Sequence, residues 1–289
     1  MDSDKQEQLE KLIRKNSKRI TDPADRPVDI LQDKQAAKLA AKSNCSLHDV
    51  YVAALGQDIW PYRYIRNRDI LSREEQLKLA NSRVAVVGSG GLGGTVIMLL
   101  ARIGVGYLTV VDYDVFDETN LNRQAVSIMS NIGELKSEEA RKMVEGFNPA
   151  VEVRSHPVKI DLSTAPAILS NADVVMDALD NVPDRLALEK VARKLEIPFV
   201  HGALAGFDGQ VMTVFPEDQG LKLLYGTDIP KSDPQRPEAV LGVPAITPSI
   251  VASLQVMEAL KILLNRGKIL RNRMLYIDLE SGRFDVFKF

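Results

Sequence analysis

Apolar and polar residues alternate in blocks that predict short β-strands separated by helices from residue 84 onward. The strand-like runs are short, continuous and apolar, whereas the runs between them space apolar residues three to four positions apart, as in a helix. Such alternation is typical of a parallel sheet covered by helices. The predicted strands are 84–87, 107–111, 151–155, 174–176 and 199–200, and the predicted helices include 136–147, 183–195 and 248–264.

Three later runs predict a different kind of strand pairing. Residues 210–215, 274–278 and 284–287 are strand-like, and only a short polar turn at 280–282 separates the last two. Strands joined by so short a turn pair antiparallel. We therefore expect an α/β fold: a Rossmann-like, doubly wound mixed sheet, parallel in its first half, with antiparallel strands added at one edge.

The first 60 residues have a separate character. Helical patterns cover 4–19, 31–41 and 46–55, the last opening with Ser46-x-x-Asp49, and a proline-containing linker covers 21–29. We predict an N-terminal helical extension at 1–60 and a nucleotide-binding domain at 61–289. The extension fits a module packed on the core, a dimer arm or a partner clamp, and the pattern does not choose among them.

Charge and composition narrow the class of protein. The 289 residues include 37 basic and 39 acidic side chains, so the formal net charge is -2. That balance gives no overall attraction to nucleic acid or to an anionic membrane. We find no signal peptide and no apolar run of about 20 residues, so we expect a soluble cytoplasmic enzyme without nucleic-acid or membrane partners.

A glycine-rich turn follows the first strand of the domain. Gly88, Gly90 and Gly93 have the spacing that allows a tight strand-to-helix turn, close backbone approach to phosphate, and close packing of helix on strand. Gly91 lies within the same turn. Asp112 follows 19 positions after Gly93 (112 minus 93), near the offset at which an acid reaches a ribose hydroxyl. These features predict a nucleotide site and fit a dehydrogenase equally well.

The segment after the second strand is unusual for a dehydrogenase. Residues 112–124 contain four acids and end in Thr119-Asn120-Leu121-Asn122-Arg123-Gln124; Lys136 opens the next helix, and Asp180-Asn181 follow a later strand. With these ordered motifs the chain resembles the ThiF/MoeB/HesA family, relatives of the ubiquitin-activating enzymes. The resemblance extends from about Arg63 to the end of the chain.

The resemblance implies an adenylyltransferase (a nucleotidyltransferase) that uses ATP and Mg²⁺. Its substrate would be the C-terminal glycine of a ubiquitin-like sulfur-carrier protein of the MoaD or ThiS type, ending in Gly-Gly. Arg123 and Lys136 would contact the triphosphate, and Asp180 would hold Mg²⁺. Asp112 would bind the ribose, and Asn120 and Gln124 would orient phosphate or the arriving carboxylate. The glycines, Asp114 and Asn181 would complete the nucleotide site.

An arginine-rich stretch precedes the glycine turn. Residues 63–67 read Arg63-Tyr64-Ile65-Arg66-Asn67, similar to the R-Y-x-R-Q motif of bacterial relatives, with Asn67 in place of Gln. The resemblance implies that Arg66 acts in the ATP site of a partner subunit, hence in a homodimer. Alternatively, Arg63, Arg66 and Arg68 form a surface strip paired with Asp69, Glu74 or Glu75, and such pairs contribute roughly 0–1 kcal/mol.

Cysteine usage limits the chemistry further. Cys45 is the only cysteine, so a Cys₄ zinc site of the kind found in many relatives is excluded. We expect the reaction to stop at the acyl-adenylate, with no catalytic-cysteine step and an inert thiol at Cys45. His201 is expected to be a hydrogen-bonded histidine near the pocket. Residues 226–242 are expected to form a mobile crossover loop over the adenylate site.

Other functions remain open at this point. An NAD-dependent oxidoreductase fits the glycine turn and Asp112 but leaves Arg123, Lys136 and Asp180 unexplained. A non-catalytic adaptor that binds a carrier protein keeps the fold without the reaction. Within the family, the adenylated carboxylate could also belong to a tRNA base or a peptide.

Overall fold

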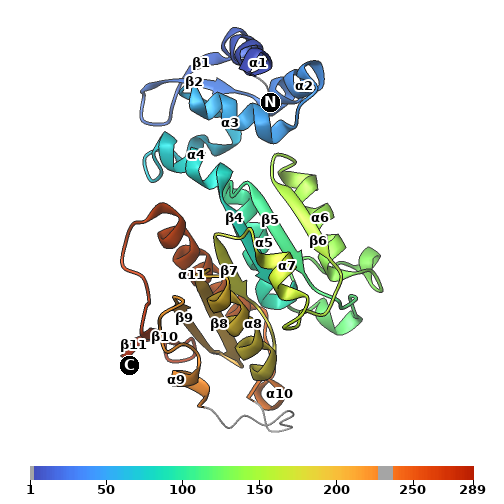
Figure 1. Ribbon diagram of the computed structural model, residues 1–289, viewed down its shortest axis with the longest axis vertical. Helices are drawn as coiled ribbons and strands as arrows, with labels where there is room; N and C mark the ends of the chain where they lie inside the picture. The colour runs from blue at the N-terminus through green and yellow to red at the C-terminus, as the bar shows by residue number, and fades with distance from the viewer. Residues whose placement is uncertain (1–2, 227–236) are drawn as a thin grey trace. The chain divides into compact units, whose positions relative to one another are not determined.

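The computed structural model describes residues 3–226 and 237–289, and the chain divides into two compact units (Figure 1). The first unit comprises Met1–Ser82, Ala101–Tyr107 and Glu145–Glu152. The second comprises Arg83–Leu100, Leu108–Val144 and Val153–Phe289. The first unit thus continues past the predicted boundary at residue 60 and takes up two later segments.

The first unit contains strands as well as the predicted helices, so the prediction of a helical extension is only partly right. β1 and β2 pair antiparallel, and β2 and β3 pair parallel, in a sheet of order β1-β2-β3. The elements are α1 (Ser3–Asn16), β1 (Lys18–Thr21), β2 (Pro27–Leu31), α2 (Asp33–Ser43), α3 (Leu47–Gly56), β3 (Ile59–Pro61), the 3₁₀ helix η1 (Tyr62–Asn67) and α4 (Arg73–Asn81).

The predicted linker at 21–29 is wrong, because these residues form most of a β-hairpin. The buried Asp22 carboxylate accepts the backbone N–H groups of Ala24 and Arg26 at 2.8 and 3.0 Å, which closes the turn, and Asp25 takes a left-handed φ of 58°. An Asx-type turn of this kind can replace the turn glycine that a sequence reading looks for. The capping box predicted at Ser46 and Asp49 is present at the start of α3.

Arginines 63 and 68 pair with acids other than those considered from the sequence. Arg63 bonds Asp33 and also donates to the Phe147 carbonyl oxygen at 2.7 Å, while Arg68 lies 2.7 Å from Asp22. Within the described part of the chain Arg66 forms no ion pair and is exposed. The first and third arginines therefore stabilise the first unit, whereas Arg66 does not.

The second unit is built on an eight-stranded sheet of order β11-β10-β9-β8-β7-β4-β5-β6. β4 and β8 pair parallel with β7, and β8/β9, β9/β10 and β10/β11 pair antiparallel, so the predicted mixed sheet is confirmed. The strands are β4 (Arg83–Val87), β5 (Tyr107–Val111), β6 (Glu152–His156), β7 (Val174–Asp177), β8 (Phe199–Ala205), β9 (Asp208–Val214), β10 (Arg273–Asp278) and β11 (Arg283–Lys288).

Helices cover both faces of this sheet (Figure 1). Leu188 of α8 packs in one core cluster with Val175 and Phe199, whereas Gln255 of α11 reaches the backbone of β7 and β8 from the other face. The helices are α5 (Gly91–Ile103), α6 (Lys136–Phe147), α7 (Ala165–Leu169), α8 (Val182–Lys194), α9 (Lys222–Tyr225), α10 (Pro237–Leu241) and α11 (Ile246–Leu264), with 3₁₀ turns η2 (Glu118–Asn120) and η3 (Met129–Asn131).

α11 has the length and apolar composition of a membrane-spanning helix. Within its 19 residues, an 18-residue window reaches a mean hydropathy of 1.3, and 56% of that window is buried inside the protein. Gln255 and Glu258 lie among its buried residues. Burial of this extent is what a core helix shows, and the helix is weak evidence for a membrane span.

Candidate active site

The glycine turn connects β4 to α5 with very little space around it. Gly88 has a φ of +93° and donates its N–H to the Val111 carbonyl oxygen at 2.8 Å. A Cβ at Gly88 would lie 2.5 Å from the Ala178 carbonyl oxygen, and one at Gly93 only 1.8 Å from the Gly88 carbonyl oxygen. The turn therefore packs against the end of β7 while the N-terminus of α5 lines the adjoining pocket.

We predict that Gly93→Ala disrupts this turn. The added methyl group must displace the backbone at Gly88, which we expect to lower the free energy of unfolding by about 1–3 kcal/mol and to abolish ATP binding, as measured by thermal unfolding and nucleotide titration. Gly146→Ala is the matched control, because that exposed glycine of α6 has no atom within 4 Å of an added Cβ. Wild-type ATP affinity in Gly93→Ala would contradict this packing.

A pocket of about 250 Å³ opens at the carboxyl ends of β4, β5 and β7. It brings together nearly all residues proposed from the sequence, although they are far apart along the chain. The predicted residues that line it are Gly88, Gly90, Gly91, Asp112, Asp114, Asn120, Arg123, Gln124, Lys136, Asp180 and Asn181.

Two predicted site residues do not line the pocket. Gly93 lies beneath the turn and acts through the close packing described above. Arg66 lies in η1 of the first unit, whereas all lining residues belong to the second. Its predicted action in a partner's site stays a prediction.

The Asp112 carboxylate accepts three hydrogen bonds from the protein itself. Its Oδ2 atom accepts the Ser89 N–H at 2.7 Å and the Ser89 hydroxyl at 2.9 Å, and its Oδ1 atom accepts the Asp114 N–H at 2.9 Å. Only 9% of the residue is exposed. Asp112 thus orients the glycine turn, in addition to any contact with a nucleotide.

Two cations line the pocket near the glycine turn. The buried Lys136 ammonium lies 3.3 Å from the Asp114 carboxylate. The Arg123 guanidinium donates to the Thr119 carbonyl oxygen at 2.9 Å and to Asn122 Oδ1 at 2.8 Å. The partner of Lys136 is an exposed carboxylate, and the partners of Arg123 are uncharged oxygens. Both side chains can therefore turn toward an anion in the pocket.

The Gln124 amide carries an unused acceptor. Gln124 is 7% exposed and lines the pocket, yet its Oε1 atom has no hydrogen-bond partner among the described residues. A buried acceptor without a partner costs about 1–3 kcal/mol. Hydroxyl and amino groups of a nucleotide would satisfy it, so the pocket's polar lining fits such a ligand.

Asp180 presents an exposed carboxylate at the pocket. Asn181 caps α8 by accepting the Asp184 N–H at 2.9 Å, and its amide donates to Asp180 at 3.2 Å and to the Asp184 carboxylate at 3.0 Å. Among the described residues no group of three or more His, Cys, Asp or Glu could hold a metal. One carboxylate nevertheless fits Mg²⁺, which binds through one or two carboxylates together with phosphate oxygens.

Sequence reasoning missed several lining residues. Tyr113, Lys159 and Arg185 line the pocket, and the Lys159 ammonium lies 3.7 Å from the Asp184 carboxylate. Lys159 follows the end of β6, so the rule that ligands bind at the carboxyl ends of strands would have indicated it. No sequence pattern indicated Arg185, because its hydrogen bonds include one to Tyr225, which lies in another element.

The expected hydrogen-bonded histidine is confirmed. His201 is fully buried, and its Nδ1 atom lies 2.7 Å from Asp177 Oδ2. It does not line the pocket but lies beneath it, and burial lowers its pKa despite the opposing effect of Asp177. Cys45 is half-buried, and burial together with Asp49 raises the pKa of its thiol, as expected for an inert cysteine.

Part of the predicted crossover loop lies outside the described residues. Residues 227–236, with Asp228, Lys231, Asp233 and Arg236, belong to that part. The described end of the loop contains α10, and Val243 just after it lines the pocket.

The ThiF family matches residues 63–289, which contain the whole pocket. The chain belongs to the ThiF family. This ThiF-family chain is 39% identical over 233 residues to the "SAMP-activating enzyme E1" of Haloferax volcanii, covering 78% of this chain and 83% of that protein. It is 38% identical over 218 residues to the "Sulfur carrier protein adenylyltransferase" of Thermus thermophilus, covering 73% and 80%.

Solved structures agree with the fold. The crystal structure of Escherichia coli MccB with ATP has a TM-score of 0.64 to this ThiF-family chain at 18% identity, covering 88% of this chain and 82% of MccB. At that identity the likeness concerns the fold alone. The predicted family, fold class and adenylyltransferase class of enzyme are thereby confirmed, and the substrate is a separate matter.

Proposed function

We propose that this protein transfers AMP from ATP to the C-terminal glycine carboxylate of a ubiquitin-like sulfur-carrier protein. One observation carries the proposal: a single pocket gathers the glycine turn, the cations Arg123 and Lys136, and the carboxylate of Asp180. The names of its relatives support the substrate class, since they include a sulfur carrier protein adenylyltransferase and a SAMP-activating enzyme.

The reaction needs charge compensation rather than a general base. A C-terminal carboxyl group has a pKa of about 3.3–3.7 and is already ionised at neutral pH. Its oxygen forms a bond to the α-phosphorus of ATP while the bond from that phosphorus to the pyrophosphate oxygen breaks. Arg123, Lys136 and the N-terminal N–H groups of α5 would stabilise the negative charge that accumulates on the phosphates.

Asp180 would hold Mg²⁺ together with phosphate oxygens, and the ion would supply positive charge to the departing pyrophosphate. Zinc has no place in this proposal, because Cys45 is the only cysteine. For the same reason we propose that the reaction ends at the acyl-adenylate. Sulfur would then be supplied by another protein.

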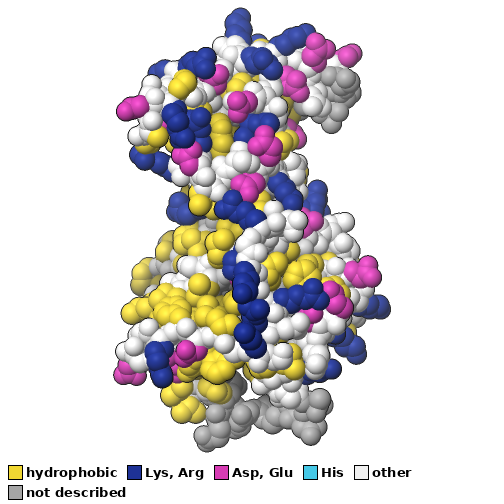
Figure 2. Space-filling view, turned by 90° about the vertical axis from the view of Figure 1, so that its left-hand side faces the viewer, with side chains coloured by type: hydrophobic (Ala, Val, Ile, Leu, Met, Phe, Trp, Pro, Cys, Tyr) yellow, Lys and Arg dark blue, Asp and Glu magenta, His cyan; other side chains and the backbone are white. Residues whose placement is uncertain are grey.

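The carrier would dock on the antiparallel edge of the sheet. Five apolar side chains on or near β11 are about half exposed to solvent. They are Phe207, Phe284, Val286, Phe287 and Phe289. Figure 2 shows hydrophobic side chains gathered on one face of the second unit. We further propose a homodimer in which the exposed Arg66 acts in the partner's site.

The test is ATP–pyrophosphate exchange with Mg²⁺ and a panel of carrier proteins ending in Gly-Gly, each paired with a version lacking those two residues. We expect exchange that requires the intact tail. Nucleotide binding without exchange for any carrier would favour the adaptor, and tighter binding of NADH than of ATP would favour the oxidoreductase. ThiF-family membership already argues against the latter.

A further inference from the structure

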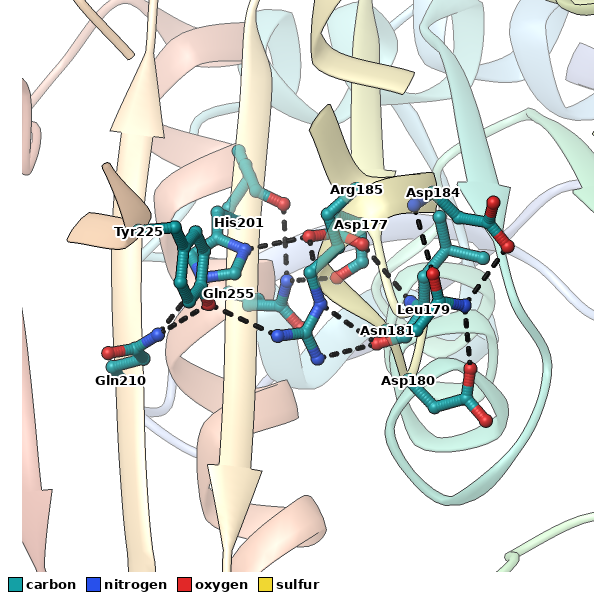
Figure 3. Close-up of polar contacts among 11 residues, drawn as sticks. Asp177, Leu179, Asp180, Asn181, Asp184, Arg185, His201, Gln210, Tyr225 and Gln255 are labelled. Atoms are coloured by element: carbon teal, nitrogen blue, oxygen red, sulfur yellow. Dashed lines mark hydrogen bonds and ion pairs between the residues drawn. The ribbon is translucent and has the colours of Figure 1, made fainter. Parts of the chain in front are cut away.

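A buried polar network lies beneath the Asp180 loop, and of its side chains only Arg185 lines the pocket (Figure 3). Asp177 at the end of β7 and His201 on β8 are both fully buried and bonded to each other. Arg185 of α8, Gln210 of β9 and Tyr225 of α9 complete it. A buried charged network is costly unless each member is satisfied, and the proposed reaction has no use for His201 or Tyr225.

One assignment of donors and acceptors accounts for the contacts of the Tyr225 hydroxyl, although Gln210 Nε2 also lies 3.3 Å from His201 Nε2. Arg185 Nη1 and Gln210 Nε2 donate to the Tyr225 hydroxyl oxygen at 3.1 and 2.8 Å. The hydroxyl hydrogen is therefore available for His201 Nε2 at 3.0 Å, and His201 Nδ1–H donates to Asp177. Burial lowers the pKa of His201, which favours the neutral ring that this assignment needs.

The network holds both backbone groups of Leu179, the residue before Asp180. Asp177 Oδ1 accepts the Leu179 N–H at 3.1 Å. Arg185 donates to the Leu179 carbonyl oxygen from Nε at 3.1 Å and from Nη2 at 2.6 Å. The two peptide groups that flank Leu179 are thus fixed, just before the exposed Asp180, by buried side chains from β7 and α8.

We propose that Tyr225 and Arg185 are positioning residues that fix the Leu179 carbonyl group and thereby place the Asp180 carboxylate for Mg²⁺-bound ATP. Tyr225 orients the Arg185 guanidinium, and Arg185 orients Leu179. This inference rests on the Mg²⁺ and ATP part of the proposed function and is independent of the carrier. Partners that orient a metal ligand typically change metal affinity or activity by about 10–100-fold when removed.

The experiment titrates ATP into the full-length protein at a series of Mg²⁺ concentrations, with and without EDTA. Tyr225→Phe removes only the hydroxyl group, and we expect it to raise the Mg²⁺ concentration for half-maximal ATP binding about tenfold without changing ATP binding in EDTA. Tyr276→Phe is the matched control. It removes a hydroxyl bonded to Asp208 at 2.7 Å in the same sheet, away from the pocket, and should leave the Mg²⁺ dependence unchanged.

Arg185→Lys keeps the charge but loses the paired donors to Leu179, so we expect a shift at least as large. The double variant Tyr225→Phe/Asp180→Asn should bind ATP like Asp180→Asn alone, because an effect that passes through Asp180 cannot add to its loss. The inference is overturned if the folded Tyr225→Phe and Arg185→Lys variants bind ATP with the wild-type dependence on Mg²⁺. It is also overturned if their ATP affinity falls as much in EDTA as it does with Mg²⁺. If exchange fails with every carrier, the proposed acceptor is wrong. The binding measurements still test this inference, because they need no carrier.

Discussion

Replacing Arg123 by alanine is expected to slow carrier-dependent ATP–pyrophosphate exchange by about 10²–10³-fold. The guanidinium lines the pocket, and its described partners are a carbonyl oxygen of Thr119 and the amide oxygen of Asn122. Neither partner carries a charge, so the cation can turn to phosphate at little cost. Its removal takes positive charge from the transition state, where charge accumulates on the departing pyrophosphate.

The fold should survive this change. Arg123 contributes no ion pair among the residues described, and its alanine variant is expected to unfold at nearly the wild-type temperature. Arg154→Ala on β6 is the control, since that arginine is exposed and does not line the pocket. Arg154→Ala should exchange at the wild-type rate. Undiminished exchange in Arg123→Ala would show that Arg123 does not act in the proposed site.

Much of the second unit was predictable because its pattern is local. The central strands of the sheet, such as β4, β5 and β7, are short apolar runs, and the predicted 107–111 strand and 136–147 helix coincide with β5 and α6. The pocket then follows from one rule, because residues at the carboxyl ends of neighbouring parallel strands meet. Asp112 and Asp180 are brought together in this way, although 68 positions separate them (180 minus 112).

The hairpin of the first unit escaped prediction for a physical reason. Its turn is closed by the Asp22 side chain, and Pro23 and Pro27 beside it are typical of a linker. The strands themselves are only four and five residues long. Their identity depends on pairing with each other and with β3, which local periodicity does not reveal.

The network around His201 was beyond sequence reasoning for a similar reason. A histidine at a strand end indicates a hydrogen-bonded side chain, but nothing local indicates Tyr225 as its partner 24 positions later. For Asp112, the sequence predicted one role and the structure adds a second. Its spacing predicted a ribose ligand, while its three hydrogen bonds to Ser89 and Asp114 show that it also holds the turn.

Asp180→Asn is expected to reduce exchange by about 10²-fold or more at physiological Mg²⁺, the range seen when an electrostatic stabiliser is removed. The substitution keeps the size of the side chain and its exposed position but removes the charge. Mg²⁺ prefers carboxylate and phosphate oxygens, so an amide should bind it more weakly. Raising the Mg²⁺ concentration should therefore recover part of the rate, which a measurement of exchange against Mg²⁺ would detect.

The partial recovery distinguishes this role from a structural one. Asp180 is exposed and its described partner is the amide of its neighbour Asn181, so its replacement should not change the unfolding temperature by more than a few degrees. Asp25→Asn is the control, because Asp25 is an exposed turn residue with a left-handed φ of 58° that asparagine also adopts. If Asp180→Asn loses exchange and no Mg²⁺ concentration restores any of it, the carboxylate acts on the substrate itself. Exchange equal to wild type at low Mg²⁺ would show instead that another group binds the ion.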